Sequence, residues 1–105
     1  MRASHILLEH AMPWPPKKRN HPRSKAEADQ LIAELRDRIY DGESFDDLAR
    51  GHSDCPSRSD GGDLGRFSHG QMTRKFSDAA FALEVGAMSE PVHTEFGVHL
   101  IFRTE

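Results

Sequence analysis

Apolar and polar positions follow two different periods in the first part of the chain. From Ala3 to Glu9 successive side chains fall on alternate faces, which predicts a β-strand with His5 near its middle. A helical pattern begins at Ser24, which forms a capping box with Glu27, and Gly42 is placed to end it. The apolar positions of this helix are Ala28, Leu31, Ile32, Leu35 and Ile39.

The middle of the chain holds two more helical patterns separated by turns. Ser44 and Asp47 form a second capping pair and predict a short helix after them. A third pattern runs from Arg74 to Leu83 and is closed by Gly86. Between these helices, Asp60-Gly61-Gly62-Asp63 marks a tight reversal of the chain.

The last patterns predict a β-hairpin. Val92 to Thr94 and Val98 to Arg103 are its strands, and Gly97 supplies the turn between them. The order of the elements is therefore strand, helices, short strand, helix and hairpin. This order predicts an α+β domain in which helices pack around a small, largely antiparallel sheet.

Residues 11–23 form the one segment that is biased in composition. Four prolines surround the basic run Lys17-Lys18-Arg19, and prolines exclude both a helix and a central strand. We therefore expect an exposed, basic, proline-rich loop within a single domain that spans residues 1–105.

The composition narrows the class of protein without identifying it. No apolar run approaches the ~20 residues of a membrane span, and 30% of the residues are charged. A net charge of −3 argues against nucleic acid or an anionic membrane as a partner. Cys55 is the only cysteine, which excludes an internal disulfide and favours a cytoplasmic location. Because no apolar stripe is left over once the core is assigned, we expect a monomer.

Few residues suggest chemistry that breaks bonds. The glycines of residues 61–65 lack the spacing and the lysine of a phosphate-binding loop. None of the seven histidines is paired at the short helical spacing of metal ligands, so no metal is expected. Cys55 is a poor candidate for a nucleophile because the preceding Asp54 opposes thiolate formation. The alternative is that Cys55 is a small, half-buried packing residue.

Two histidines lie among apolar strand residues, where an imidazole needs hydrogen-bond partners. His5 is in the first predicted strand and His99 is in the last, so the rings could bond to each other if these strands are neighbours. Thr94 and Cys55 would then complete a polar network. On the residues alone, such a network either satisfies buried polar groups or serves a functional site.

Four segments, in the same order along the chain, resemble the parvulin family of peptidyl-prolyl cis/trans isomerases. They are Gly62-Asp63-Leu64-Gly65-x-Phe67-x-x-Gly70-Gln71-Met72, Phe76-x-Asp78-Ala79-Ala80-Phe81-x-Leu83, Gly86-x-Met88-Ser89-x-Pro91-Val92 and Thr94-Glu95-Phe96-Gly97-Val98-His99. The opening Arg2-Ala3-Ser4-His5-Ile6-Leu7 matches as well. Ser53-Asp54-Cys55 and Arg103-Thr104-Glu105 are most similar to the Pin branch, which prefers phosphorylated Ser/Thr-Pro.

The resemblance implies a fold and an activity. The fold would be a four-stranded, largely antiparallel sheet surrounded by about four helices. The activity would be rotation about X-Pro peptide bonds in proline-containing polypeptides, without a cofactor, by non-covalent stabilisation of the twisted amide. Such an enzyme would assist protein folding or conformational switching.

The resemblance also implies two sets of site residues. The catalytic set is His5, Cys55, Thr94 and His99, which would act by electrostatics and positioning rather than by covalent attack. The substrate-binding set would hold the proline ring in an apolar pocket. Its members are Leu7, Leu64, Met72, Phe76 and Phe96. Gln71 and Phe67 lie nearby and are expected to be structural.

The residues depart from the Pin branch where a phosphate would bind. Glu9 stands where that branch has a lysine, and its charge would repel a phosphate. Phe96 replaces a small polar residue and is commoner in parvulins that take unphosphorylated substrates. A general isomerase is therefore favoured over a phosphate-directed one that would use Lys17, Lys18 and Arg19. A third interpretation, a module that binds proline-containing segments without catalysis, is disfavoured because pocket and polar network are both kept.

Overall fold

The computed structural model describes residues 1–10 and 23–105. In this range the strands are β1 (Arg2–Leu8), β2 (Asp63–Arg66), β3 (Val92–Thr94) and β4 (Gly97–Arg103). The helices are α1 (Lys25–Tyr40), α2 (Phe45–His52), α3 (Arg74–Ala82) and a 3-10 helix, η1 (Pro56–Asp60). Apart from Arg23, the predicted basic loop at 11–23 lies outside the described residues. No helix in the described ranges is long and apolar enough to cross a membrane.

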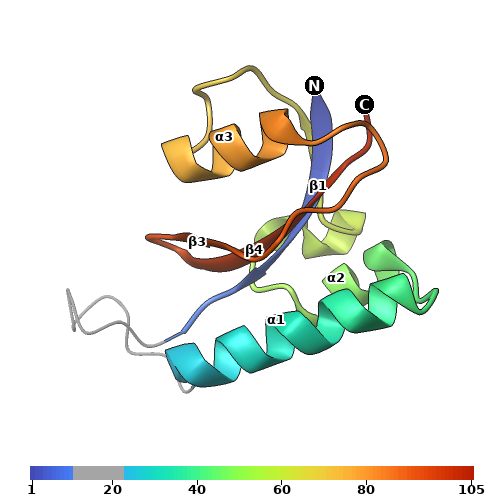
Figure 1. Ribbon diagram of the computed structural model, residues 1–105, viewed down its shortest axis with the longest axis vertical. Coiled ribbons are helices and arrows are strands. Elements are labelled where there is room, and N and C mark those ends of the chain that lie inside the picture. Colours follow the sequence, from blue (N-terminus) through green and yellow to red (C-terminus); the bar gives the residue numbers. More distant parts are fainter. Residues whose placement is uncertain (11–22) are drawn as a thin grey trace.

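The two long strands, β1 and β4, form the centre of the sheet. The strand order is β2-β1-β4-β3, and the described strands pair antiparallel. Figure 1 shows α3 on one side of this sheet and α1 and α2 on the other. Side chains alternate along β1, so that His5 faces α3 whereas Ile6 faces α1 and α2. Ser4 and Leu8 share the side of Ile6.

Each side of the sheet has its own apolar core. On the side of α1 and α2 the buried members are Ile6, Leu8, Ala28, Ile32, Leu35, Phe45, Leu48, Ala49, Val98 and Leu100. On the side of α3 the core is smaller, and its buried members are Ala3, Phe67, Phe76, Ala80 and Ile101. Leu64 and Met72 pack against the smaller core and are only partly buried. These two side chains therefore remain available to line a pocket.

Two glycines are required where the chain presses against the backbone of β1. A Cβ on Gly62 would lie 2.4 Å from the carbonyl oxygen of His5, and a Cβ on Gly97 would lie 2.4 Å from that of Leu8. Both glycines have positive φ, 85° and 144°, which other residues rarely adopt. The His5 N–H donates to the Gly62 carbonyl at 2.9 Å. Gly62 therefore sets how closely the turn after η1 holds His5.

The α+β class and the four-stranded sheet are confirmed. The described residues hold three α-helices and one 3-10 helix, where about four helices were expected. No pattern predicts η1, because a helix of five residues with no buried side chain carries no apolar period. β1 ends at Leu8 rather than Glu9, because the Glu9 N–H donates to Asp54 Oδ2 at 2.9 Å instead of extending the ladder.

Candidate active site

A pocket of about 420 Å³ opens between α3 and the sheet. Its lining residues are His5, Leu7, Cys55, Leu64, Gln71, Met72, Thr73, Phe76, Phe96 and His99. They come from β1, β2, β4, α3 and the loops beside these elements, so the pocket is assembled only when the chain folds. Most of the lining is apolar, and the volume lies in the range of small-molecule pockets. The pocket can therefore hold a small apolar ring.

The two buried histidines meet across the central strands. Leu7 is opposite His99 in the β1–β4 ladder, which brings the rings of His5 and His99 together on the α3 side. Their Nδ1 atoms are 3.1 Å apart, and the ring centroids are 5.3 Å apart. His99 Nε2 lies 2.7 Å from Thr94 Oγ1, which also accepts the Phe96 N–H at 3.2 Å. The predicted contact of His5, His99 and Thr94 is thus present.

Burial keeps both imidazoles neutral at neutral pH. It lowers the pKa of His5 to about 4. Burial, together with charge repulsion from His5 and His93, lowers the pKa of His99 to about 3. Two neutral rings share an Nδ1···Nδ1 hydrogen bond only when one of them carries its proton on Nδ1. In either arrangement His5 Nε2 is buried and has no hydrogen-bond partner among the described residues.

Cys55 lies in a loop that is hydrogen-bonded to β1, and its side chain lines the pocket. The Asp54 N–H donates to the Leu7 carbonyl at 2.7 Å. The hydroxyl of the buried Ser53 accepts the N–H groups of Leu7 and Cys55 at 3.1 and 3.4 Å. The half-buried Cys55 thiol lines the pocket, but in the described part of the chain it makes no hydrogen bond with either strand histidine. Cys55 therefore belongs to the pocket wall and not to the hydrogen-bonded chain of histidines.

Helix α3 supplies the apolar wall opposite the sheet. Its first turn is capped by Thr73, whose hydroxyl accepts the Phe76 N–H at 3.4 Å. Phe76 is 3% exposed and meets both histidine rings edge-on. Its ring centroid lies 5.5 Å from that of His5 and 5.3 Å from that of His99. The same aromatic side chain therefore lines the pocket and covers the buried histidines.

The structure brings nearly all of the predicted site residues into this pocket. The five residues predicted to bind substrate all line it. Of the predicted catalytic set, His5, Cys55 and His99 line it as well, whereas Thr94 lies behind His99 as its hydrogen-bond partner. The predicted phosphate-binding residues Lys17, Lys18 and Arg19 lie outside the described residues.

Two lining residues are missing from the predicted set. Gln71 was expected to be structural, and its side chain does accept the Ser68 N–H at 2.6 Å, yet it also lines the pocket. Thr73 lines the pocket next to its role as a helix cap. Both residues flank Met72 in the sequence, and this adjacency is the only signal that could have identified them.

The free energy of unfolding should fall as the pH is lowered from 7. Unfolded histidines bind protons near their ordinary pKa of about 6.5. In the folded chain the pKa is lowered to about 4 for His5 and to about 3 for His99. Between these values the unfolded state binds more protons, so each histidine should reduce stability by about 1.4 kcal/mol per pH unit. This stability is fully present above pH ~6.5 and is lost progressively below it.

Denaturant unfolding at about pH 7, 6 and 5 measures this slope. His99→Gln should flatten it, whereas His69→Gln, a change at an exposed histidine, should leave it as it is. A free energy of unfolding that stays constant over this range would contradict the buried, neutral state of the pair.

Comparison with known proteins identifies the class of protein to which this fold and pocket belong. Residues 5–105 match the family model described as "Rotamase: PPIC-type PPIASE domain". The chain therefore belongs to the family of PPIC-type peptidyl-prolyl cis/trans isomerases, the parvulins. Its activity is the cis/trans isomerisation of bonds that precede proline in polypeptides.

Individual relatives resemble the chain over nearly its whole length. The peptidyl-prolyl cis-trans isomerase Pin1 of Malus domestica is 47% identical, over 99% of this chain and 93% of the relative. The isomerase pin1 of Rhizopus delemar is 44% identical, over 99% of this chain and 72% of the relative. Among solved structures, the peptidyl-prolyl isomerase ESS1 from Candida albicans superimposes with a TM-score of 0.88 at 37% identity. That match covers 99% of this chain and 62% of the Candida chain.

Proposed function

We propose that the chain rotates X-Pro bonds by holding the proline ring in the pocket and favouring the twisted amide without covalent chemistry. The observation that carries this proposal is the apolar pocket of about 420 Å³ set directly against two buried, neutral histidines. The ring would occupy the space between Leu64, Met72 and Phe76. The bond before proline would then lie beside the histidine pair.

The reaction needs no bond to be broken. Resonance gives the peptide bond a rotation barrier of ~18–20 kcal/mol, and at proline the two isomers differ by only about 0.5–1 kcal/mol. An enzyme therefore has only to bind the twisted amide better than either planar form. Each ~1.4 kcal/mol of this preference accelerates rotation about tenfold.

The proposed roles of the polar residues follow from their surroundings. His5 and His99 are uncharged, so they would act on the amide through their dipoles and hydrogen-bonding atoms rather than as charged acids. Thr94 would hold the ring of His99 in place through the 2.7 Å contact to Nε2. Cys55 would contribute a small, weakly polar wall, and it is not proposed as a nucleophile.

We further propose that the substrate needs no phosphate on the residue before proline. Among the described residues that line the pocket, none is a lysine or an arginine. Glu9 places a carboxylate at the end of β1. The Arg23 guanidinium donates to Asp54 and to the Glu9 carbonyl, at 2.8 Å in each case, so it is held at this strand end. Phe96, 41% exposed, adds an apolar side chain to the lining.

A peptide series tests the substrate preference. Matched peptides with Ala-Pro, Glu-Pro and phospho-Ser-Pro are compared for kcat/KM, and the phosphopeptide should exceed the Ala-Pro peptide by less than about tenfold. The alternative, a phosphate-directed isomerase that uses Lys17, Lys18 and Arg19, predicts a gain of about a hundredfold that is lost when these three are neutralised. That outcome would replace the proposed preference and leave the isomerase itself intact.

Location, assembly and biological role are also proposals. We infer that residues 1–105 act as one domain, in the cytoplasm and as a monomer, and that the enzyme assists protein folding or conformational switching. The single free cysteine supports a reducing compartment. Cell fractionation tests the cytoplasmic location, and sedimentation of the purified chain tests the monomeric state.

A further inference from the structure

A second pocket lies on the opposite side of the sheet from the pocket beneath α3, in which the proline ring is proposed to bind and which we call the proline pocket. Its volume is about 250 Å³, and β1 contributes Arg2 and Ser4 to its lining. Ser4 precedes His5 on β1, so the two side chains point to opposite sides of the sheet. The rest of the lining comes from α2, η1, β2 and the residues after β4. We call this cavity the Ser4 pocket.

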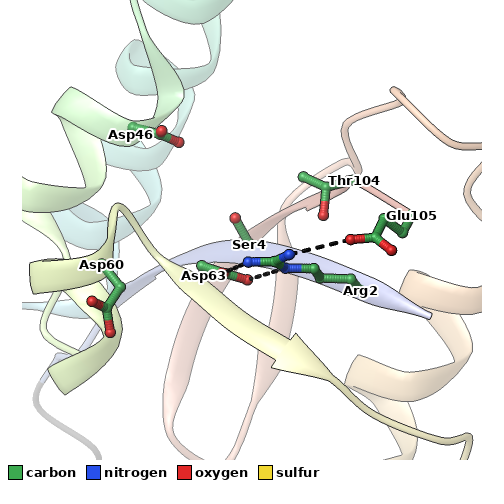
Figure 2. A pocket seen from close by; sticks show the side chains of 7 residues that line it. All are labelled: Arg2, Ser4, Asp46, Asp60, Asp63, Thr104 and Glu105. Atoms are coloured by element: carbon green, nitrogen blue, oxygen red, sulfur yellow. Dashed lines mark hydrogen bonds and ion pairs between the residues drawn. The ribbon is translucent and has the colours of Figure 1, made fainter.

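The Ser4 pocket is strongly acidic. Four carboxylates line it, those of Asp46, Asp60, Asp63 and Glu105, against the single guanidinium of Arg2. Figure 2 shows Arg2 held between Asp63 and Glu105. The Arg2 Nε–Asp63 Oδ1 distance is 3.1 Å, and the Arg2 Nη1–Glu105 Oε2 distance is 3.2 Å. Asp63 and Glu105 are thus already paired.

The other two carboxylates have no such partner. In residues 1–10 and 23–105 neither Asp46 nor Asp60 has an ion pair or a side-chain hydrogen bond. Their elements are neighbours because α2 packs against the end of η1. A Cβ on Gly61, the residue after Asp60, would lie only 3.0 Å from Asp46 Cγ. The pocket lining therefore includes two carboxylates without an ion pair in the described ranges, of which Asp46 lies in the first turn of α2.

Ser4 gives an independent sign of a ligand. The residue is 5% exposed, and its side chain points from β1 into the space between Asp46 and Thr104, as Figure 2 shows. Its hydroxyl has no hydrogen-bond partner among the residues that the structure describes. The oxygen itself is not one of the fully buried unpaired atoms, so it is accessible from the pocket and can pair with a group that enters it. A ligand with N–H donors would pair with the Ser4 hydroxyl.

The lining restricts the chemistry of the ligand. Carboxylates repel anions, and a lining of polar side chains does not suit an apolar group. No cluster of three or more His, Cys, Asp or Glu in the described ranges could hold a metal ion. The volume of about 250 Å³ lies below the roughly 300–1,000 Å³ of pockets for whole small molecules, so it suits the end of a side chain. A guanidinium brings five N–H donors in a planar fork that matches carboxylates and hydroxyls.

We propose that the Ser4 pocket binds the guanidinium of an arginine side chain in a partner polypeptide. The guanidinium pairs with Asp46 and Asp60 and donates to the hydroxyls of Ser4 and Thr104. Binding here is separate from the proline pocket because the sheet lies between them. A segment that carries an arginine can therefore bind on this side of the sheet while an X-Pro bond is isomerised on the other side.

The test uses the isotope-labelled full chain and the proline-free peptide acetyl-Ala-Arg-Ala-amide, followed by amide chemical shifts. We expect saturable shifts centred on Ser4 and Thr104. Asp46→Asn combined with Asp60→Asn should weaken binding about tenfold, because two partly shielded ion pairs are lost. Asp37→Asn, an exposed acidic position on α1, is the matched control and should change affinity less than about twofold.

Ser4→Ala separates binding from folding. It removes a pocket-lining hydroxyl that bonds to no described residue, so the melting temperature should not fall, while affinity for the arginine peptide should drop by about threefold or more. Isomerase activity on an Ala-Pro peptide should be unchanged in all these variants. A failure of this proposal therefore leaves the isomerase assignment untouched.

Three results would overturn the proposal. The peptide is also tested with its arginine replaced by citrulline, which is uncharged, or by lysine. The first contradicting result is that the citrulline peptide shifts the amide signals as much as the arginine peptide does. The second is an equal or tighter response to the lysine peptide, which would remove the selection for a guanidinium. The third is an equal response to magnesium chloride, or shifts spread over the whole surface, which would reduce the effect to general attraction of cations.

Discussion

Gly62→Ala is expected to destabilise the fold by about 3 kcal/mol, because strain and a steric overlap act at the same atom. Gly62 has φ 85°, a conformation that alanine rarely adopts, and an added Cβ would lie 2.4 Å from the carbonyl oxygen of His5. Because the His5 N–H also donates to the Gly62 carbonyl, relief of the overlap must move β1 or the turn. The melting temperature should drop by more than about 10 °C, measured by thermal unfolding.

Gly51→Ala is the matched control for this substitution. Gly51 lies in α2, its φ is not in the left-handed range, and a Cβ there would have no neighbour within 4 Å. Alanine is the better helix former, so this variant should be unchanged or more stable by up to about 1 kcal/mol. If both variants unfold at the same temperature, Gly62 does not govern the approach of the turn to β1.

Phe76→Ala is expected to reduce kcat/KM roughly 10- to 100-fold. The proposed pocket would lose the apolar wall against which the proline ring packs, and burying one such side chain is worth about 1.5–3 kcal/mol. The substitution also uncovers the His5 and His99 rings, which Phe76 contacts edge-on. Stability should fall by about 3–5 kcal/mol as well, so activity is measured at a temperature where the variant is folded.

Phe67→Ala separates the loss of the pocket from the loss of the core. Phe67 is 6% exposed, belongs to the same apolar core as Phe76 and does not line the pocket. Its replacement should cost a similar free energy of unfolding but change kcat/KM less than about threefold. Equal losses of activity in the two variants would mean that Phe76 acts only through the core. Met72→Ala, at a partly buried lining position, gives a second reading if Phe76→Ala does not fold.

Local patterns were enough to predict most of the elements. Capping residues and apolar periods act within a few positions of one another, so the start of α1 at Ser24 and Glu27 is readable without the rest of the chain. The same holds for the short hairpin strand Val92–Thr94. The helix η1 and the true end of β1 were not readable. The end of β1 depends on a hydrogen bond between segments distant in sequence, that of the Glu9 N–H with Asp54. The helix η1 is too short, and too exposed, to carry an apolar period.

The residues that line the pocket between α3 and the sheet were predicted largely through family motifs, and the chain's own pattern supplied less. Without the family motifs, the core is the preferred place for Phe76, and in the structure Phe76 belongs to the core and also lines the pocket. Sequence could suggest that His5 and His99 pair, but their 3.1 Å contact requires β1 and β4 to be neighbours in the sheet. The place of Cys55 in the wall, without a hydrogen bond to either histidine in the described residues, was not foreseen.

The Ser4 pocket shows the physical limit of local reasoning most clearly. Ser4 and Thr104 lie in segments that resemble the parvulin family and Asp60 lies in a predicted turn, but nothing in these segments predicts that they meet Asp46 in one pocket. Periodicity can state that Ser4 and His5 point to opposite sides of a strand, because that depends only on backbone geometry. Which groups meet on each side depends on strand order and helix packing. Strand order and helix packing arise from contacts between segments that are distant in sequence, and the spacing of residues along the chain does not reveal such contacts.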